Sequence, residues 1–168
     1  YRTNWVFVKV ETDSGLHGWG EATLEHREPT VAQAVRELER YLVGQDPHNI
    51  EKFFHDNYRD AYWRGGPVLM SALAGVEIAL WDIKGKDLGV PVYQLLGGRY
   101  RDQVELIWGV GLNDTETRVR EAIQAVDAGY NTIKMKISGK PALDIEQVGA
   151  VRAAVGPKVH IRLDANQG

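Results

Sequence analysis

Strand and helix patterns alternate through the second half of the chain, and this alternation limits the possible folds more than any other feature. Residues 104–110, 131–137 and 159–164 have strand character, and helical patterns lie between them at 115–128 and 143–155. A strand–helix repeat of about 27 residues predicts right-handed βαβ units and a parallel sheet. A doubly wound sheet could be completed near this length, whereas a closed β/α barrel needs about 250 residues and the chain has 168. Topology alone leaves both architectures open.

The first half of the chain is organised differently, as a β-hairpin followed by helices. Residues 5–12 and 16–22 have strand character on either side of a turn-forming stretch at 13–15. Apolar stripes at helical spacing then predict three helices, beginning at Pro29, at Asp46 and near Leu69. We expect a small α+β domain over residues 1–101 and the parallel-sheet region over 102–168.

Helix starts in the first half carry sequence signals of their own. Thr30 with Gln33 is a candidate capping box for the first helix, and Asp46 is a candidate cap for the second. Gly89 and Pro91 predict the end of the third helix.

Composition excludes several classes of function. The net charge is −3 with scattered Lys and Arg, so nothing indicates nucleic-acid binding. The absence of cysteine excludes disulfides, thiolate metal sites and Cys nucleophiles. No apolar run approaches the ~20 residues that cross a bilayer, and no signal peptide is recognisable. We therefore expect a cytoplasmic protein without a membrane partner.

Two lysines share one face of the strand at 131–137. Side chains alternate along a strand, so Lys134 and Lys136 point to one side, and Ile133, Met135 and Ile137 to the other. Both faces of a parallel sheet are normally covered, which makes paired lysines costly unless they have a purpose. An edge strand with a solvated lysine face is the alternative interpretation.

The next strand ends in a carboxylate, Asp164. Ile161 and Leu163 are expected to face the helices, and Arg162 and Asp164 the interior. Asp164 then lies at the C-terminal tip, where β/α-barrel active sites occur. It could form a buried ion pair with a lysine or bind Mg²⁺, which prefers carboxylate oxygens. One Asp does not hold Mg²⁺ tightly, so further ligands would have to come from later strands.

These motifs resemble the mandelate racemase and muconate lactonizing enzyme branch of the enolase superfamily. The resemblance rests on Lys-Met-Lys at 134–136, Asp-Ala-Asn-Gln at 164–167, Gly-Trp-Gly-Glu at 18–21, Arg-Gly-Gly-Pro at 64–67, Ala-Leu-Trp-Asp-Ile-Lys-Gly-Lys at 79–86 and Pro-Val-Tyr-Gln-Leu-Leu-Gly-Gly at 91–98. It implies an α+β capping domain followed by the first strands of a TIM-type β/α barrel. On this interpretation the chain is an incomplete fragment that lacks the first capping strand, exposes sheet edges and is inactive alone.

The resemblance also implies roles for individual residues. Lys136 would be the general base that removes the proton α to a carboxylate, and Lys134 would lie beside that carboxylate and help keep Lys136 in its basic form. Asp164 would be the first of three Mg²⁺ ligands, and the metal would stabilise the enediolate. Candidate substrate contacts are Asn166, Glu21, Trp63 and Arg64. A solvated loop is the alternative for Glu21, and packing between the domains is the alternative for Trp63 and Arg64.

The function that we expect is Mg²⁺-dependent dehydration of a sugar acid, because the Arg-Gly-Gly-Pro stretch and the following helix look most like acid-sugar dehydratases. Racemases, epimerases and cycloisomerases share the Lys-Met-Lys and Asp-Ala-Asn-Gln motifs and remain alternatives. A truncated, non-catalytic binding or oligomerisation module is an alternative of another class. A self-contained phosphate-binding sheet is disfavoured, since no Gly-rich phosphate loop follows any strand. We expect the full-length protein to be a homo-oligomer.

Overall fold

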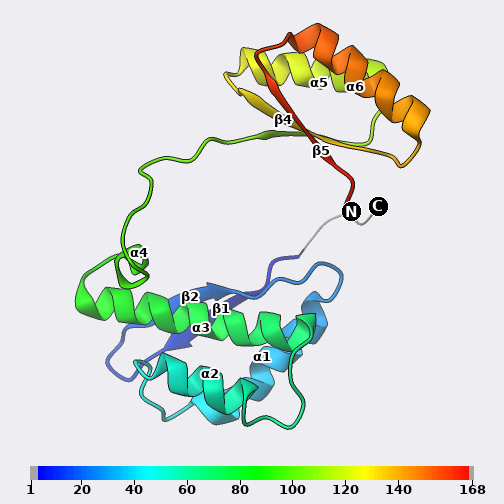
Figure 1. Cartoon of the computed structure of the whole chain (residues 1–168). Helices are drawn as coiled ribbons and strands as arrows, with labels where there is room; N and C mark the ends of the chain where they lie inside the picture. The colour runs from blue at the N-terminus through cyan, green and yellow to red at the C-terminus, as the bar shows by residue number, and fades with distance from the viewer. Residues whose placement is uncertain (1–3, 167–168) are drawn as a thin grey trace. The chain divides into compact units, whose positions relative to one another are not determined.

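The computed structural model describes residues 4–166, and the chain divides into two compact units, Tyr1–Tyr100 and Arg101–Gly168 (Figure 1). The first unit combines a two-stranded antiparallel hairpin with four helices. Its elements are β1 (Phe7–Glu11), β2 (His17–Glu21), α1 (Glu28–Leu42), α2 (Ile50–Tyr58), α3 (Pro67–Leu88) and the short α4 (Val92–Leu95). The hairpin and the three longer helices were predicted, whereas α4 was not.

Helix α3 lies directly on the backbone of β2. A Cβ atom on Gly20 would lie 1.8 Å from the carbonyl oxygen of Gly75, and one on Gly18 would lie 2.0 Å from that of Ala79. Only glycine leaves room for such a close approach of strand and helix. The Asp82 carboxylate adds a polar tie, because it accepts a 2.9 Å hydrogen bond from the backbone N–H of Trp19.

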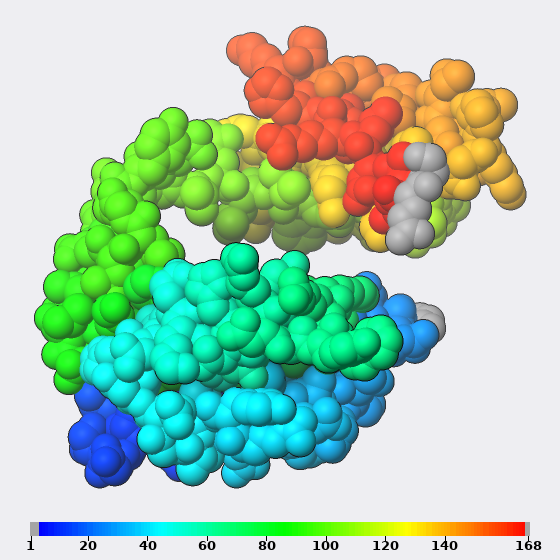
Figure 2. Space-filling model, turned by 60° about the horizontal axis from the view of Figure 1, so that its bottom comes forward, coloured from blue at the N-terminus to red at the C-terminus, as the bar shows by residue number. Residues whose placement is uncertain are grey.

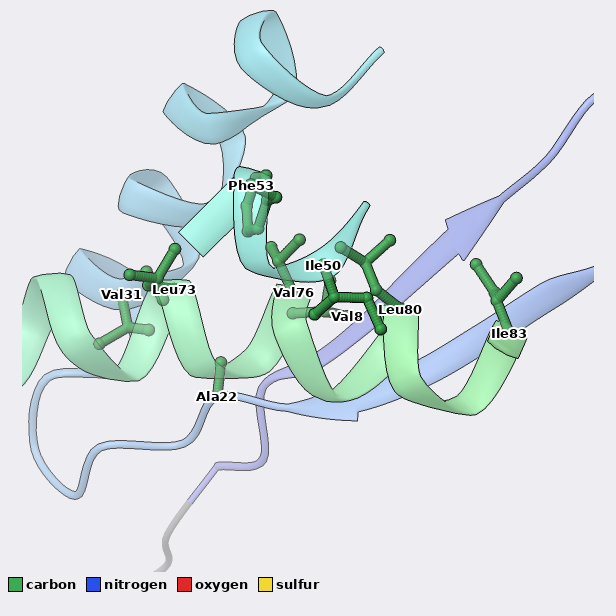
Figure 3. Close-up of a cluster of buried hydrophobic side chains, with 10 residues drawn as sticks. Val8, Ala22, Val31, Ile50, Phe53, Leu73, Val76, Leu80 and Ile83 are labelled. Carbon is green, nitrogen blue, oxygen red and sulfur yellow. The ribbon is translucent and has the colours of Figure 1, made fainter. Parts of the chain in front are cut away.

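The core of this unit collects apolar side chains from the hairpin and from α1, α2 and α3 (Figure 3). Periodic apolar residues on α3 provide the centre of the cluster, since Leu73, Val76, Leu80 and Ile83 recur at three- and four-residue spacing. The hairpin adds Val8 and Ala22 to it, and the other two helices add Val31, Ile50 and Phe53. Burial of this stripe is what fixes α3 between the hairpin and the other two helices.

The two predicted N-terminal caps in this unit are wrong, whereas Gly89 ends α3 as predicted, in the left-handed conformation. Helix α1 begins at Glu28 with Pro29 in its first turn, so Thr30 lies inside the helix and caps nothing. Proline fixes the backbone dihedral φ at the value that the first helical turn requires, so the helix begins earlier in the sequence than a cap at Thr30 would allow. Helix α2 begins at Ile50, and Asp46 instead accepts hydrogen bonds from the His48 N–H and the Asn49 side chain in the preceding turn.

The second unit is a three-stranded parallel sheet with two helices. In chain order its elements are β3 (Trp108–Val110), α5 (Thr115–Asp127), β4 (Thr132–Lys136), α6 (Pro141–Val155) and β5 (His160–Asp164), and the strand order is β3-β4-β5 (Figure 1). The predicted strand at 104–110 is shorter than expected. Its pairing with β4 starts only at Trp108, opposite Ile133, and Val104 and Leu106 before it are exposed.

Helices α5 and α6 cover one face of this sheet. Ile133 and Met135 of β4 are 0 % exposed in the resulting core, and Ile161 of β5 packs against it. Leu163 was expected to face the helices as well, but it is 53 % exposed because the two helices do not cover the end of the edge strand. No helix among the described residues is long and apolar enough to span a membrane.

Candidate active site

The uncovered face of the second unit carries the charged residues of β4 and β5. Lys134 and Lys136 alternate with the buried Ile133 and Met135 and therefore point away from the helices. In the parallel register Lys136 lies opposite Asp164. The last pair of the β4–β5 ladder thus places an amine and a carboxylate side by side at the C-terminal ends of their strands.

Asp164 receives two donors, one on each carboxylate oxygen. The Lys134 Nζ lies 3.2 Å from Oδ2, and the backbone N–H of Asn166 donates to Oδ1 at 2.9 Å. Asn166 adopts a left-handed φ of 53°, which asparagine tolerates better than most residues and which closes the turn after β5. These donors hold the pKa of Asp164 below its ordinary value, with the Asn166 N–H contributing most and the Lys134 ammonium next. Asp164 is therefore an ionised carboxylate at neutral pH.

This carboxylate fits a magnesium ligand but does not form a complete site. A carboxylate has about four lone-pair positions, and two donors leave positions free for a cation. Within residues 4–166, however, no three His, Asp or Glu side chains come together as a metal cluster. The described chain thus provides one oxygen ligand of the hard type that Mg²⁺ prefers.

A further carboxylate near this edge was missed by the sequence interpretation. Asp144, in the first turn of α6, accepts hydrogen bonds from the Ser138 N–H, the Ser138 hydroxyl and the Gly139 N–H, all within the loop that follows β4. Those bonds hold the pKa of Asp144 below its ordinary value, chiefly through the Ser138 N–H. The available signal was an acidic residue in the first turn of a helix, where a negative charge is favourable; its hydrogen bonds to Ser138 and Gly139 had no sequence signal.

Three predicted substrate contacts belong to the first unit. Glu21 ends β2, and its carboxylate accepts a hydrogen bond from the Thr23 N–H at 2.8 Å. Trp63 is 78 % exposed with its ring at 5.1 Å from that of Tyr62 in an edge-on contact, and the Arg64 Nε donates to the Ala61 carbonyl at 3.3 Å. The structure therefore brings Lys134, Lys136, Asp164 and Asn166 together, and it places Glu21, Trp63 and Arg64 in the other unit.

Trp63 and Arg64 border a hollow of about 390 Å³ between α1, α2 and the start of α3. Figure 2 shows the face of the first unit that α1 and α2 form, in light blue to cyan. Glu21 does not line this hollow. Aromatic and charged side chains line much of it, among them Tyr41, Tyr58, Asp60 and Trp63.

Comparison with known families agrees with this architecture. Residues 1–97 match the mandelate racemase/muconate lactonizing enzyme N-terminal domain, and residues 117–168 match the enolase C-terminal domain-like family. The chain belongs to the mandelate racemase/muconate lactonizing enzyme branch of the enolase superfamily. The predicted fold class, a capping domain followed by the first strands of a β/α barrel, is confirmed.

Curated relatives and solved structures agree on the superfamily and differ in activity. Two proteins named D-galactonate dehydratase, from Ralstonia nicotianae and Verminephrobacter eiseniae, are 46% and 47% identical over 95% of this chain. The chain spans 44% of the length of each. An N-succinyl Arg/Lys racemase from Bacillus cereus aligns with a TM-score of 0.90 at 34% identity, over 99% of this chain and 45% of its own. A 3,6-anhydro-D-galactonate cycloisomerase from Zobellia galactanivorans aligns with a TM-score of 0.87 at 31% identity, over 96% of this chain and 46% of its own.

Proposed function

We propose that the protein to which this chain belongs is a Mg²⁺-dependent acid-sugar dehydratase in which Lys136 removes the proton α to the substrate carboxylate. The observation that carries this proposal is the pair of Lys136 and Asp164, in register at the C-terminal ends of β4 and β5. The names of the two relatives at 46% and 47% identity support a sugar acid as the substrate class.

The proposed first step follows from the acidity of the substrate. A proton α to a carboxylate is very weakly acidic, so its removal requires a nearby base and stabilisation of the developing negative charge. The Lys136 amine takes the proton, and the Lys134 ammonium offsets charge on the substrate carboxylate. The hydroxyl on the β-carbon then takes up a proton and leaves as one water molecule, and the resulting enol tautomerises to a 2-oxo acid.

Asp164 would hold Mg²⁺ together with ligands from outside the described residues. When bound, the metal supplies electrostatic stabilisation for the charge that develops on the substrate carboxylate. The Asn166 N–H keeps Asp164 ionised and oriented for this role. Roles in substrate binding for the side chains of Asn166, Glu21, Trp63 and Arg64, and a homo-oligomeric full-length protein, stay predictions.

Exchange of the α-proton tests the assignment of the base. In the full-length protein, Lys136→Met should abolish incorporation of solvent deuterium at the α-carbon of a sugar acid, measured by NMR in D₂O. Lys158→Met is a matched control, because Lys158 is exposed in the turn before β5 at the other end of the strand. Exchange that persists in Lys136→Met would exclude Lys136 as the base.

Racemisation is the second candidate, and the structural similarity to the N-succinyl Arg/Lys racemase favours it. Both reactions begin with the same proton abstraction, so deuterium exchange does not separate them. The product does: a dehydratase forms a 2-oxo acid with loss of water, whereas a racemase returns substrate of inverted configuration. Screening sugar acids and N-acylated amino acids in parallel, with and without Mg²⁺, decides between the two.

A further inference from the structure

The segment that follows the proposed base, residues 137–139, is held by hydrogen bonds on two sides. Asp144 is 8 % exposed, and its Oδ1 accepts from the Ser138 N–H at 2.8 Å and from the Ser138 hydroxyl at 2.9 Å. Its Oδ2 accepts from the Gly139 N–H at 3.1 Å. On the other side, the Ile137 N–H donates to the Asp164 carbonyl at 3.1 Å. Residues 137–139 are thereby joined to β5 and to α6 directly after Lys136.

We propose that Asp144 is a positioning residue: by fixing the loop after β4, it holds the end of the strand that carries Lys136 in place for proton transfer. This inference rests on the proposed function. Asp144 would act through the backbone rather than by touching the substrate. Displacement of a reacting group by about 1 Å can cost roughly a hundredfold in rate. Because the loop follows Lys136 directly, its anchoring sets the position of the amine and therefore the rate of proton transfer.

An ionised carboxylate is suited to this task. Hydrogen bonds to a charged acceptor are about twice as strong as neutral ones, and two oxygens can receive three donors at once. Asparagine has nearly the same shape but replaces one acceptor oxygen with an N–H₂ group, which only donates, so either the Ser138 donors or the Gly139 N–H lose their acceptor. Asp144→Asn therefore loosens the loop while the space that the side chain fills changes little.

Asp114 provides a matched control in the same unit. Its carboxylate likewise accepts from a backbone N–H and a hydroxyl, both of Thr117, at 2.8 and 2.9 Å. These bonds cap α5 and do not involve the segment after β4. Asp114→Asn thus makes the same replacement of a hydrogen-bonded carboxylate by an amide in this unit, without releasing the loop beside Lys136.

The test uses the full-length protein and measures kcat, KM and the primary deuterium isotope effect for a sugar acid labelled at the α-carbon. With kcat corrected for the folded fraction, Asp144→Asn should lower kcat by roughly tenfold or more, leave KM within about twofold and raise the isotope effect. A larger isotope effect means that proton transfer limits the rate more strongly, and partial unfolding alone does not change it. Asp114→Asn should keep the wild-type kcat and isotope effect.

Ser138→Ala keeps the inference testable if Asp144→Asn does not fold, because it removes only the hydroxyl donor. It should lower kcat and raise the isotope effect in the same direction by a smaller factor. Wild-type kinetics per folded molecule in these variants, or equal effects in Asp114→Asn, would overturn the positioning role alone when Lys136→Met is inactive. Exchange that survives Lys136→Met overturns the proposed function as well as the positioning role.

Discussion

In the hairpin of the first unit one strand face is pressed against α3, backbone to backbone, whereas in the second unit the face of β4 opposite the helices carries lysines. Gly18 and Gly20 have no side chain, which allows α3 to approach the backbone of β2. Lys134 and Lys136 instead have long side chains on the face that neither α5 nor α6 of their own unit covers. The comparison separates residues that hold the fold from residues available for chemistry: both pairs recur at alternate strand positions, and only their surroundings tell them apart.

Substitution of Gly20 should have the largest effect on stability. A Cβ atom at this position would lie 1.8 Å from the Gly75 carbonyl oxygen, and backbone cannot move aside as a flexible side chain can. Gly20→Ala should therefore destabilise the first unit by about 3 kcal/mol or more, measured by thermal unfolding followed by circular dichroism. In Gly149→Ala, by contrast, the added Cβ meets open space in the middle of α6, and we expect a gain of up to about 1 kcal/mol. Equal midpoints for Gly20→Ala and wild type would contradict the backbone contact.

The polar tie between β2 and α3 should have a smaller effect that depends on pH. Partial burial raises the pKa of Asp82, but hydrogen bonds from the Lys86 ammonium and the Trp19 N–H outweigh burial and bring it below the ordinary value. A carboxyl whose pKa is lowered by folding stabilises the protein above its unfolded-state pKa, and that stability is lost as the pH falls through the folded-state pKa. Asp82→Asn should therefore cost about 1–2 kcal/mol at pH 7 and flatten the loss of stability in acid. Denaturant unfolding from pH 7 down to pH 3 measures both effects, and parallel curves for variant and wild type would contradict this role.

In the second unit, one substitution is expected to increase the free energy of unfolding. Arg118 on α5 is 1 % exposed, and its Nε and Nη1 have no hydrogen-bond partner among the described residues. Replacing a buried, poorly paired charge with an apolar side chain of similar length is often stabilising, so Arg118→Met should raise the free energy of unfolding by about 1 kcal/mol. Arg120→Met on the exposed side of the same helix should stay within about 0.5 kcal/mol of wild type. A loss of stability in Arg118→Met would show that the guanidinium is paired in the full-length protein.

The sequence predicted the elements of the second unit well because their apolar patterns are local. Alternation in β4 identified which side chains face the helices, and it placed Lys134 and Lys136 on the opposite face without any knowledge of the sheet. The position of Asp164 opposite Lys136 required the register, which the strand pattern alone leaves open. Register depends on which backbone groups pair between strands, and the βαβ repeat constrained it only indirectly.

Features that depend on the exact path of the backbone could not be predicted from the sequence. Thr30 and Asp46 had the right chemistry for caps, but α1 begins at Glu28, before Thr30, and α2 begins only at Ile50, after Asp46. The hydrogen bonds from Ser138 and Gly139 to Asp144 depend on the conformation of the loop after β4, which the sequence pattern does not specify. Leu163 showed that alternation gives the direction of a side chain but not whether a neighbour reaches it.

The charge distribution on the uncovered face of β4 and β5 also has a kinetic consequence. Lys134 and Arg162 contribute two cationic groups beside the carboxylate of Asp164, so the face is net positive even when Lys136 is the neutral amine that the proposed reaction requires. Such a field draws anions toward it before any contact forms and weakens as dissolved ions screen it. An anion such as the proposed carboxylate substrate should therefore associate faster with this face at low ionic strength, and its association rate should fall as salt is added.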